Sequence, residues 1–371
     1  MKKTSKQIDF KGIAVLSVGI LLLVFALIKT TDYGIASPKI IAMFIGSVVL
    51  LGLFIYIEKK AKAPMLELAL FSERNFRNST ICIMFLGIAL APSIFLMNFF
   101  MNNVLGFTSI KTGLTLCTLS VASMFISIIT PMFYKKLGYR IFNIISMLAF
   151  IGGNYLLSKL TFDSSQSQII GMLMVLGLAM GCGAPALIGG SLRYIKDEKT
   201  GIASGVVNMS RQIGVLLGIA IFVSILNNKM TVNFDLGKKD FVSSIQASSI
   251  LDDKVKTNMI KSVNNLTTES TQSNKKAILT TMDKEKENAL KTVPTAKKVE
   301  VSAKFEAEKV EISKLIDKGT IILKSKSTEA FNFTFLCSSI FLLISLFFAF
   351  RTGTKKTSSR KNEELVEAFE N

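Results

Sequence analysis

One apolar stretch, GIASGVVNMSRQIGVLLGIAIF (201–222), carries the side chains best suited to bind a ligand. It is long enough to cross a membrane, yet Asn208, Arg211 and Gln212 lie near its middle. An ionisable side chain within a span is costly unless it faces a bundle interior or a water-filled cavity, and such residues often mark substrate or ion pathways. Guanidinium and amide groups donate hydrogen bonds, but a guanidinium does not release its proton. The chemistry predicted here is therefore binding and not proton transfer.

Helical periodicity gathers the small and polar residues of this stretch on one side. At 100° per residue they share an arc of about 120°; we call this set the polar arc, and it consists of Gly201, Ser204, Gly205, Asn208, Arg211 and Gln212. Gly214 and Gly218 form a GxxxG pair at its edge, which permits close approach of another helix. We expect the four glycines to serve packing and gating. Arg211 either faces a bundle interior or wet cavity, or ties neighbouring carbonyls together structurally.

Composition indicates a membrane protein. Hydrophobic residues make up 50% of the 371 residues and charged residues only 19%, against about a quarter in soluble domains. The charges are segregated, which leaves runs long enough to cross about 30 Å of hydrocarbon as helices. We predict an all-α polytopic membrane protein with eight spans, at 12–28, 39–57, 80–102, 113–134, 141–160, 167–192, 201–226 and 331–350. The first span imitates a signal peptide, but no small-x-small cleavage site follows it, which favours a retained helix.

The basic residues predict an orientation. They cluster before the first span, in the link 59–79, near 135–140, near 193–199 and in the tail 351–371. These clusters lie on alternate connections, and the positive-inside rule places them in the cytoplasm. We therefore expect a multi-pass protein of the plasma membrane, in contact with lipid, with both termini cytoplasmic. The net charge of +18 is distributed around apolar segments, which argues against nucleic acid as a partner.

The segment 227–330 interrupts the series of spans. It is rich in lysine and lacks arginine, and the alternation of spans places it outside the cell. Val301, Phe305, Ile312 and Ile316 fall on one helical face, which predicts a helical hairpin or paired helices, with Pro294 near a turn or a helix start. The alternative is a lysine-rich tether with transient helices. The resulting divisions are two linker helices (1–58), a cytoplasmic link (59–79), five bundle helices (80–226), the outer loop (227–330), a last span (331–350) and a tail (351–371).

Other residues suggest supporting roles. Asn98 and Asn154 are further candidates to line a substrate pathway, with interfacial hydrogen bonding as the alternative reading. Gly181 and Pro185 are expected to loosen the sixth span. The chain has no histidine, and its four cysteines are far apart, so we expect no metal site and no cofactor. No P-loop or nucleophile elbow is present in the sequence, so we expect no enzymatic activity.

Several ordered motifs resemble one transporter family. The pattern GxASGxxNxxRQIGxxxGxAI at 201–221 resembles the penultimate helix of fourteen-helix drug:proton antiporters of the major facilitator superfamily, the QacA/EmrB type. The start IDFKG is similar to the opening of that family's seventh helix, and 55–79 to the link into its C-terminal six-helix bundle. The glycine-rich 171–191 resembles its twelfth helix. In PMFYKKLGYR, Gly138 and Arg140 match a cytoplasmic loop motif of the superfamily, although the usual aspartate is replaced.

The resemblance implies efflux of drugs or small organic molecules by alternating access between two bundles. It begins at the family's second half, so the N-terminal six helices and their proton-coupling acids are not represented here. No Asp or Glu lies deep in any span. Proton coupling would then require an N-terminal transporter half, encoded separately or lost by truncation. Two alternatives remain: a membrane scaffold that displays 227–330, and a nonfunctional remnant of a transporter.

Overall fold

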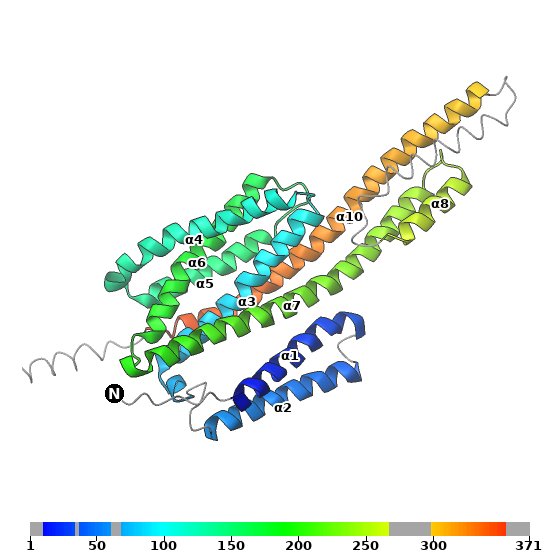
Figure 1. Ribbon diagram of the computed structural model, residues 1–371. Coiled ribbons are helices and arrows are strands. Elements are labelled where there is room, and N and C mark those ends of the chain that lie inside the picture. The colour runs from blue at the N-terminus through cyan, green and yellow to red at the C-terminus, as the bar shows by residue number, and fades with distance from the viewer. Residues whose placement is uncertain (1–9, 34–36, 61–67, 267–297, 354–371) are drawn as a thin grey trace, which may run out of the picture.

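The computed structural model describes residues 10–33, 37–60, 68–266 and 298–353, and within these ranges the regular structure is helical (Figure 1). Eight helices are long and apolar enough to cross a membrane, which confirms the predicted all-α polytopic class. Their bounds are α1 Phe10–Tyr33, α2 Pro38–Lys60, α3 Arg74–Asn103, α4 Ser109–Leu137, α5 Tyr139–Leu157, α6 Gln166–Leu192, α7 Asp197–Gln246 and α10 Lys298–Ala349. The short helices η1 (Leu68–Ser72) and α8 (Asp253–Asn264) complete the described elements.

Side-chain caps mark where several bundle helices begin. The Thr108 hydroxyl accepts a hydrogen bond from the backbone N–H of Lys111, and α4 starts directly after it. Ser165 and Gln168 form a reciprocal capping box at the start of α6. The Glu73 carboxylate accepts the N–H of Phe76 at the start of α3. Each cap satisfies a backbone donor that the first helical turn leaves unpaired.

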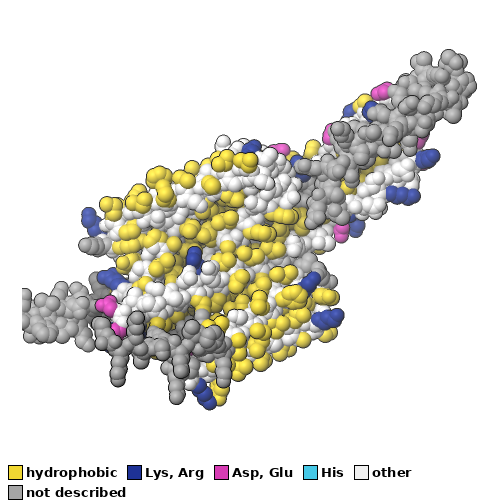
Figure 2. Space-filling model, in the orientation of Figure 1, with side chains coloured by type: hydrophobic (Ala, Val, Ile, Leu, Met, Phe, Trp, Pro, Cys, Tyr) yellow, Lys and Arg dark blue, Asp and Glu magenta, His cyan; other side chains and the backbone are white. Residues whose placement is uncertain are grey.

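Six helices, α3, α4, α5, α6, α7 and α10, form one bundle around a common hydrophobic core. α3 lies at its centre, with 67% of its apolar window buried, against 11% for α4. Phe76, Phe100 and Phe331 are fully buried within this core. Figure 2 shows hydrophobic side chains covering the visible outside of the bundle, as expected for a surface that meets lipid.

The first two helices form a separate hairpin that lies along α7 (Figure 1). The Ser47 hydroxyl on α2 donates a hydrogen bond to the Gly19 carbonyl on α1, over 2.8 Å. The Ser224 hydroxyl on α7 donates to the Leu27 carbonyl on α1, over 2.6 Å. Small polar side chains thus join α1 to α2 and α1 to α7. Such hydrogen bonds are common between transmembrane helices, because there is no hydrophobic driving force for helix association in lipid.

Two helices continue far beyond the membrane-sized bundle. α7 has 50 residues and α10 has 52, and together with α8 they form an elongated extension (Figure 1). The extension has its own buried apolar cluster, to which Phe234, Phe241, Met259 and Leu323 contribute. α7 runs unbroken through 226 and α10 through 330, the predicted ends of two membrane spans, so the divisions at these points stay predictions. Ile312 is buried and Ile316 packs against the same cluster, whereas Val301, Phe305 and Pro294 lie outside the residues whose side chains are described.

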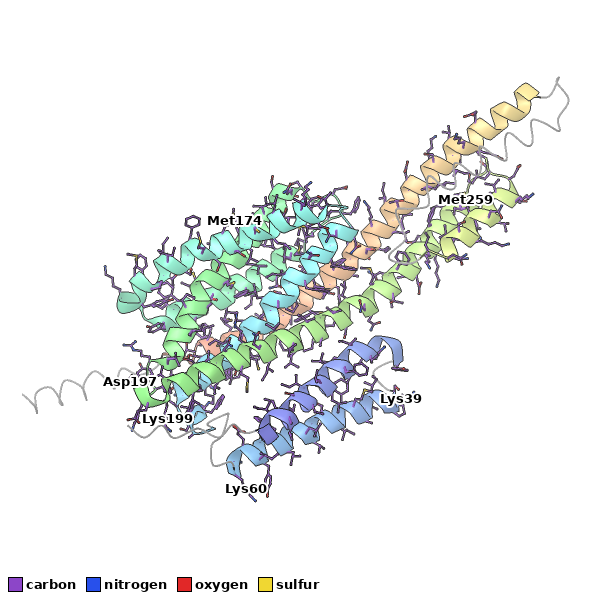
Figure 3. All side chains as sticks on the ribbon, in the orientation of Figure 1. Lys39, Lys60, Met174, Asp197, Lys199 and Met259 are labelled. Atoms are coloured by element: carbon purple, nitrogen blue, oxygen red, sulfur yellow. The ribbon has the colours of Figure 1, made fainter. Side chains whose placement is uncertain are left out.

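One end of the bundle gathers arginine. Of the arginines in the described ranges, all but Arg211 lie at this end, which we call the arginine end: Arg74, Arg77, Arg140, Arg193 and Arg351. They belong to the start of α3, the start of α5, the end of α6 and the end of α10. Figure 3 places Lys60, Asp197 and Lys199 toward the same end, and Lys39 toward the other. This arrangement agrees with basic clusters on alternate connections.

Candidate functional site

The polar arc of α7 forms an exposed surface on the membrane-spanning part of the bundle. All six of its residues are exposed in the structure. The Arg211 guanidinium donates a hydrogen bond from Nη2 to Oδ1 of Asn208, over 3.0 Å, one helical turn earlier. A guanidinium has five N–H donors, so this contact leaves donors that face outward.

Close helix packing explains which side of α7 points outward. A Cβ atom added to Gly214 would collide with the carbonyl of Met84 on α3, and one added to Gly218 with the carbonyl of Ile88. On the facing helix, a Cβ atom at Gly87 would collide with the backbone carbonyl of Arg211. These three glycines let the two backbones approach closely. The side of α7 that bears Gly214 and Gly218 therefore faces α3.

The α1–α2 hairpin covers the opposite side of α7 from the polar arc. Ser224, which bonds α1, follows Asn208 by sixteen residues, and this places it about 160° around the helix. The aliphatic back of α7 thus has a helix against it, whereas the polar arc has none among the described helices.

Of the two settings expected for Arg211, the interior of this bundle is not the one observed, because Arg211 is exposed; a place beside a wet cavity stays a prediction. Within 201–221 the buried residues of α7 are small or aliphatic, among them Ala203, Val206 and Val207. Because α3 approaches on the glycine side, the longer polar side chains are directed outward. Arg211 donates to the side chain of Asn208, so the alternative of a tie between neighbouring carbonyls has no support here.

The two predicted asparagines occupy different environments. Asn98 is exposed on α3, and its Oδ1 accepts a hydrogen bond from Asn102 over 3.0 Å. Asn154 is fully buried: its Oδ1 accepts from the Ser93 hydroxyl over 2.7 Å, and its amide donates to the Phe150 carbonyl over 3.0 Å. Asn154 is therefore a tie between α5 and α3, and it does not lie on the open surface. Asn98 stays a prediction as a lining residue.

The other residues predicted to serve packing and gating also lie in different environments. Gly181 approaches α4 so closely that a Cβ atom would meet the Ser123 carbonyl. A Cβ atom at Gly201 or Gly205 would meet nothing within 4 Å, because both lie in the exposed polar arc. Pro185 lies within α6, which is one continuous helix, and the expected loosening of this span stays a prediction. The glycines of α6 serve packing.

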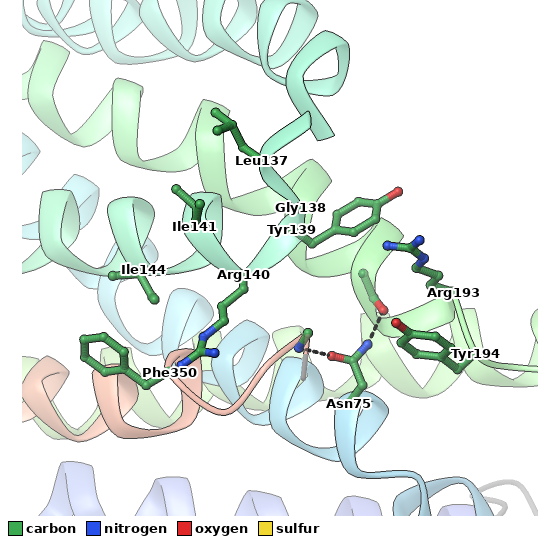
Figure 4. A pocket seen from close by; sticks show the side chains of 12 residues that line it. Asn75, Leu137, Gly138, Tyr139, Arg140, Ile141, Ile144, Arg193, Tyr194 and Phe350 are labelled. Carbon is green, nitrogen blue, oxygen red and sulfur yellow. Dashed lines mark hydrogen bonds between the residues drawn. The ribbon is translucent and has the colours of Figure 1, made fainter. Parts of the chain in front are cut away.

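The loop-motif residues line a pocket at the arginine end (Figure 4). Gly138, with φ +74°, joins α4 directly to α5, in a conformation that favours glycine. Arg140 follows in the first turn of α5, and the pocket beside it has a volume of about 470 Å³. Arg193, at the end of α6, lies on the same pocket with its guanidinium carbon 5.8 Å from the ring centre of Tyr139 and 5.7 Å from that of Tyr194.

Three asparagines that sequence reasoning missed anchor the end of α10 near this pocket. Asn78 donates to the Arg351 carbonyl over 3.1 Å, and Asn143 donates to the Thr352 hydroxyl over 3.0 Å. Asn75 accepts the backbone N–H of Gly353 over 2.6 Å and donates to the Gly190 carbonyl over 2.5 Å. An amide near the end of an apolar span is a weak signal of such a tie, because its partner is distant in sequence.

Comparison with known proteins identifies relatives of the chain. Multidrug transporter protein MdtP of Bacillus subtilis is 28% identical over 220 residues, which cover 59% of this chain and 41% of that protein. Multidrug resistance protein 3 of the same organism is 28% identical over 234 residues, covering 62% and 45%. Quinolone resistance protein NorB of Staphylococcus aureus is 25% identical over 218 residues, covering 58% and 47%. No family model matches the chain.

The relatives are drug-resistance transporters of the major facilitator superfamily. They are transporters and not enzymes, which agrees with the expectation from the sequence. The chain spans less than half the length of each of these three relatives. The eight apolar helices and these homologues together support a multi-pass membrane protein.

Proposed function

We propose that this chain is one half of an exporter for drugs or small organic molecules, of the fourteen-helix antiporter type. Its six-helix bundle would form one wall of the substrate pathway, and the α1–α2 hairpin would flank it on the lipid side. A second bundle, not among the described helices, would form the other wall. We place the protein in the plasma membrane with the arginine end in the cytoplasm, following the positive-inside rule.

The observation that carries this proposal is the exposed polar arc around Arg211. Arg211 lies ten residues into the stretch that begins at Gly201, about 15 Å along the helix and so near the middle of the hydrocarbon. An arginine that faced lipid there would cost about 3 kcal/mol or more. A water-filled pathway or a polar partner bundle removes that cost. The side covered by α1 carries no such charge, so the polar arc is the side suited to a pathway.

Arg211 would act by binding, through the guanidinium donors that Asn208 leaves free. Suitable substrates carry hydrogen-bond acceptors or anionic groups, which pair well with a guanidinium. Proton coupling, if the complete transporter has it, needs a titratable acid that the second half supplies, because a guanidinium keeps its proton.

The proposal is tested by dye efflux from cells that lack other exporters. The chain would be expressed together with, or fused behind, the N-terminal six-helix bundle of a fourteen-helix relative, and ethidium efflux would be followed by fluorescence. Loss of a hydrogen bond to a charged group costs about 1.5–3 kcal/mol, so Arg211→Ala should lower the efflux rate roughly 10- to 100-fold. Arg211→Lys should retain part of the activity.

The matched control is Arg77→Ala, which removes an exposed arginine at the start of α3, away from the polar arc. It should leave efflux nearly unchanged, while membrane insertion of both variants, measured as the amount of folded protein in the membrane, stays equal. Equal efflux by Arg211→Ala and the parent would refute the pathway role of the polar arc. A chain that supports no efflux with any N-terminal bundle would refute the exporter itself.

A further inference from the structure

The pocket at the arginine end is built from four separate parts of the chain. Asn75 at the start of α3, the α4–α5 junction at Gly138, the end of α6 at Gly190 and Arg193, and Gly353 after α10 all line it. Figure 4 shows Arg140 and Arg193 on opposite sides of Asn75. One side of the pocket is apolar, with Leu137, Ile141, Ile144 and Phe350.

The two arginines of this pocket lack acidic partners in the described structure. Neither Arg140 nor Arg193 forms an ion pair with a described carboxylate. Asp197 and Glu198, the nearest acids along the chain, are exposed in the first turn of α7, where they complement the helix dipole. Asn75 carries no charge to neutralise either arginine, and its amide already accepts the Gly353 N–H and donates to the Gly190 carbonyl. The pocket therefore offers two guanidinium groups to a ligand from outside the described residues.

The ligand chemistry that fits is a carboxylate beside an apolar group. A guanidinium binds carboxylate through two parallel N–H donors, and the rings of Tyr139 and Tyr194 beside Arg193 favour a cation in that place. The apolar side of the pocket would be satisfied by aliphatic or aromatic side chains.

The chain itself carries a segment of this composition. Residues 362–371, NEELVEAFEN, include four glutamates and no lysine or arginine, together with Leu365, Val366 and Phe369. The segment from 354 to 361 is basic, so the pocket repels it, and anionic lipid headgroups attract it. The acidic residues are thus the part of the tail that the pocket selects.

Geometry brings this segment within reach of the pocket. Gly353, from which the tail continues, itself lines the pocket and is held there by Asn75. Glu363 follows ten residues later, a stretch that spans up to about 35 Å when extended. A short tether of this kind gives a local concentration in the millimolar range, so even weak ion pairs are formed.

We propose that the pocket is the docking site of the chain's own acidic segment 362–371, with its glutamates paired to Arg140 and Arg193. Docking would join the α4–α5 junction, the end of α6 and the end of α10 through one ligand. The proposal does not depend on the transport function, and its test measures distance and not efflux.

The test is a distance measurement between two spin labels in the full-length chain, placed in nanodiscs of phosphatidylcholine. With the four native cysteines replaced by alanine, labels would be attached to Lys136→Cys, exposed beside the pocket, and to Ala368→Cys in the tail. A docked tail gives a narrow, short distance distribution. R140Q/R193Q should abolish this population, and so should changing all four tail glutamates to glutamine.

The matched control is R74Q/R77Q, which removes the same charge from the arginine end but outside the pocket, and it should leave the narrow distribution intact. The tail variant guards against misfolding, because it alters no residue of the bundle. A distribution that is broad in the parent, or that R140Q/R193Q leaves unchanged, would overturn the proposal.

Discussion

The contact between α3 and α7 gives the sharpest prediction about stability. At Gly214 and Gly218 the atom in the way of an added methyl group is a backbone carbonyl of α3, which cannot rotate aside. Overpacking of this kind costs about 1–3 kcal/mol per site. Alanine gains about 0.5–1 kcal/mol over glycine in a helix, which offsets only part of the cost. The double variant G214A/G218A should therefore lose about 1–4 kcal/mol.

The matched pair G201A/G205A lies on the same helix and gains the same helix propensity, but an added methyl group there meets nothing within 4 Å. The double variant should be as stable as the parent or about 1–2 kcal/mol more stable. Thermal unfolding of the purified chain in detergent measures both. If a kcal/mol shifts the midpoint by about 2–4 °C, G214A/G218A should melt several degrees below the parent. Equal midpoints for the two double variants would refute the close-approach reasoning.

Two further predictions concern the interior of the bundle and the extension. A double-mutant cycle of Ser93→Ala and Asn154→Ala should show a coupling of about 0.5–2 kcal/mol in thermal unfolding, since the two side chains share a buried hydrogen bond; additive effects would contradict this tie. Replacing 235–325 by a short glycine-serine linker should leave the melting of the transmembrane bundle unchanged, because the extension has its own apolar cluster and Asn233 already donates to the Lys326 carbonyl over 3.0 Å. Loss of membrane insertion in that variant would show that the extension stabilises the bundle.

The sequence predicted the spans well because hydropathy reports contact with lipid directly. It did not predict where α7 and α10 end, since a helix can continue into water without any change in hydrogen bonding. The continuation does have a signal: Phe234, Phe241 and Ile245 recur at helical spacing on one face of α7. These residues are buried in the extension, so this apolar stripe was the sequence signal that α7 continues beyond the membrane-spanning part.

The polar arc shows what periodicity can and cannot predict. The spacing of Asn208, Arg211 and Gln212 correctly places them on one face, because that depends only on the helical repeat. Whether that face points into the bundle depends on which side α3 occupies. The glycines that fix this contact are visible in the sequence, but the backbone that they meet on α3, at Met84 and Ile88, lies far away along the chain. The bond between Asn154 and Ser93 could not be read from the sequence for the same reason, because Ser93 is on another helix.

The exposed arginine has a further implication for the chain in a bilayer. Asn208 satisfies one of the Arg211 donors, and the others would face hydrocarbon if lipid covered the polar arc. The aliphatic back of α7 could tolerate lipid, yet α1 covers it through Ser224. On its aliphatic side, where contact with lipid would cost little free energy, α7 packs against α1. No described helix covers the polar arc, where contact with lipid would cost most. This distribution favours a polar neighbour for the arc, as either the water of a pathway or a second bundle, and it argues against a scaffold that uses the eight helices only as an anchor.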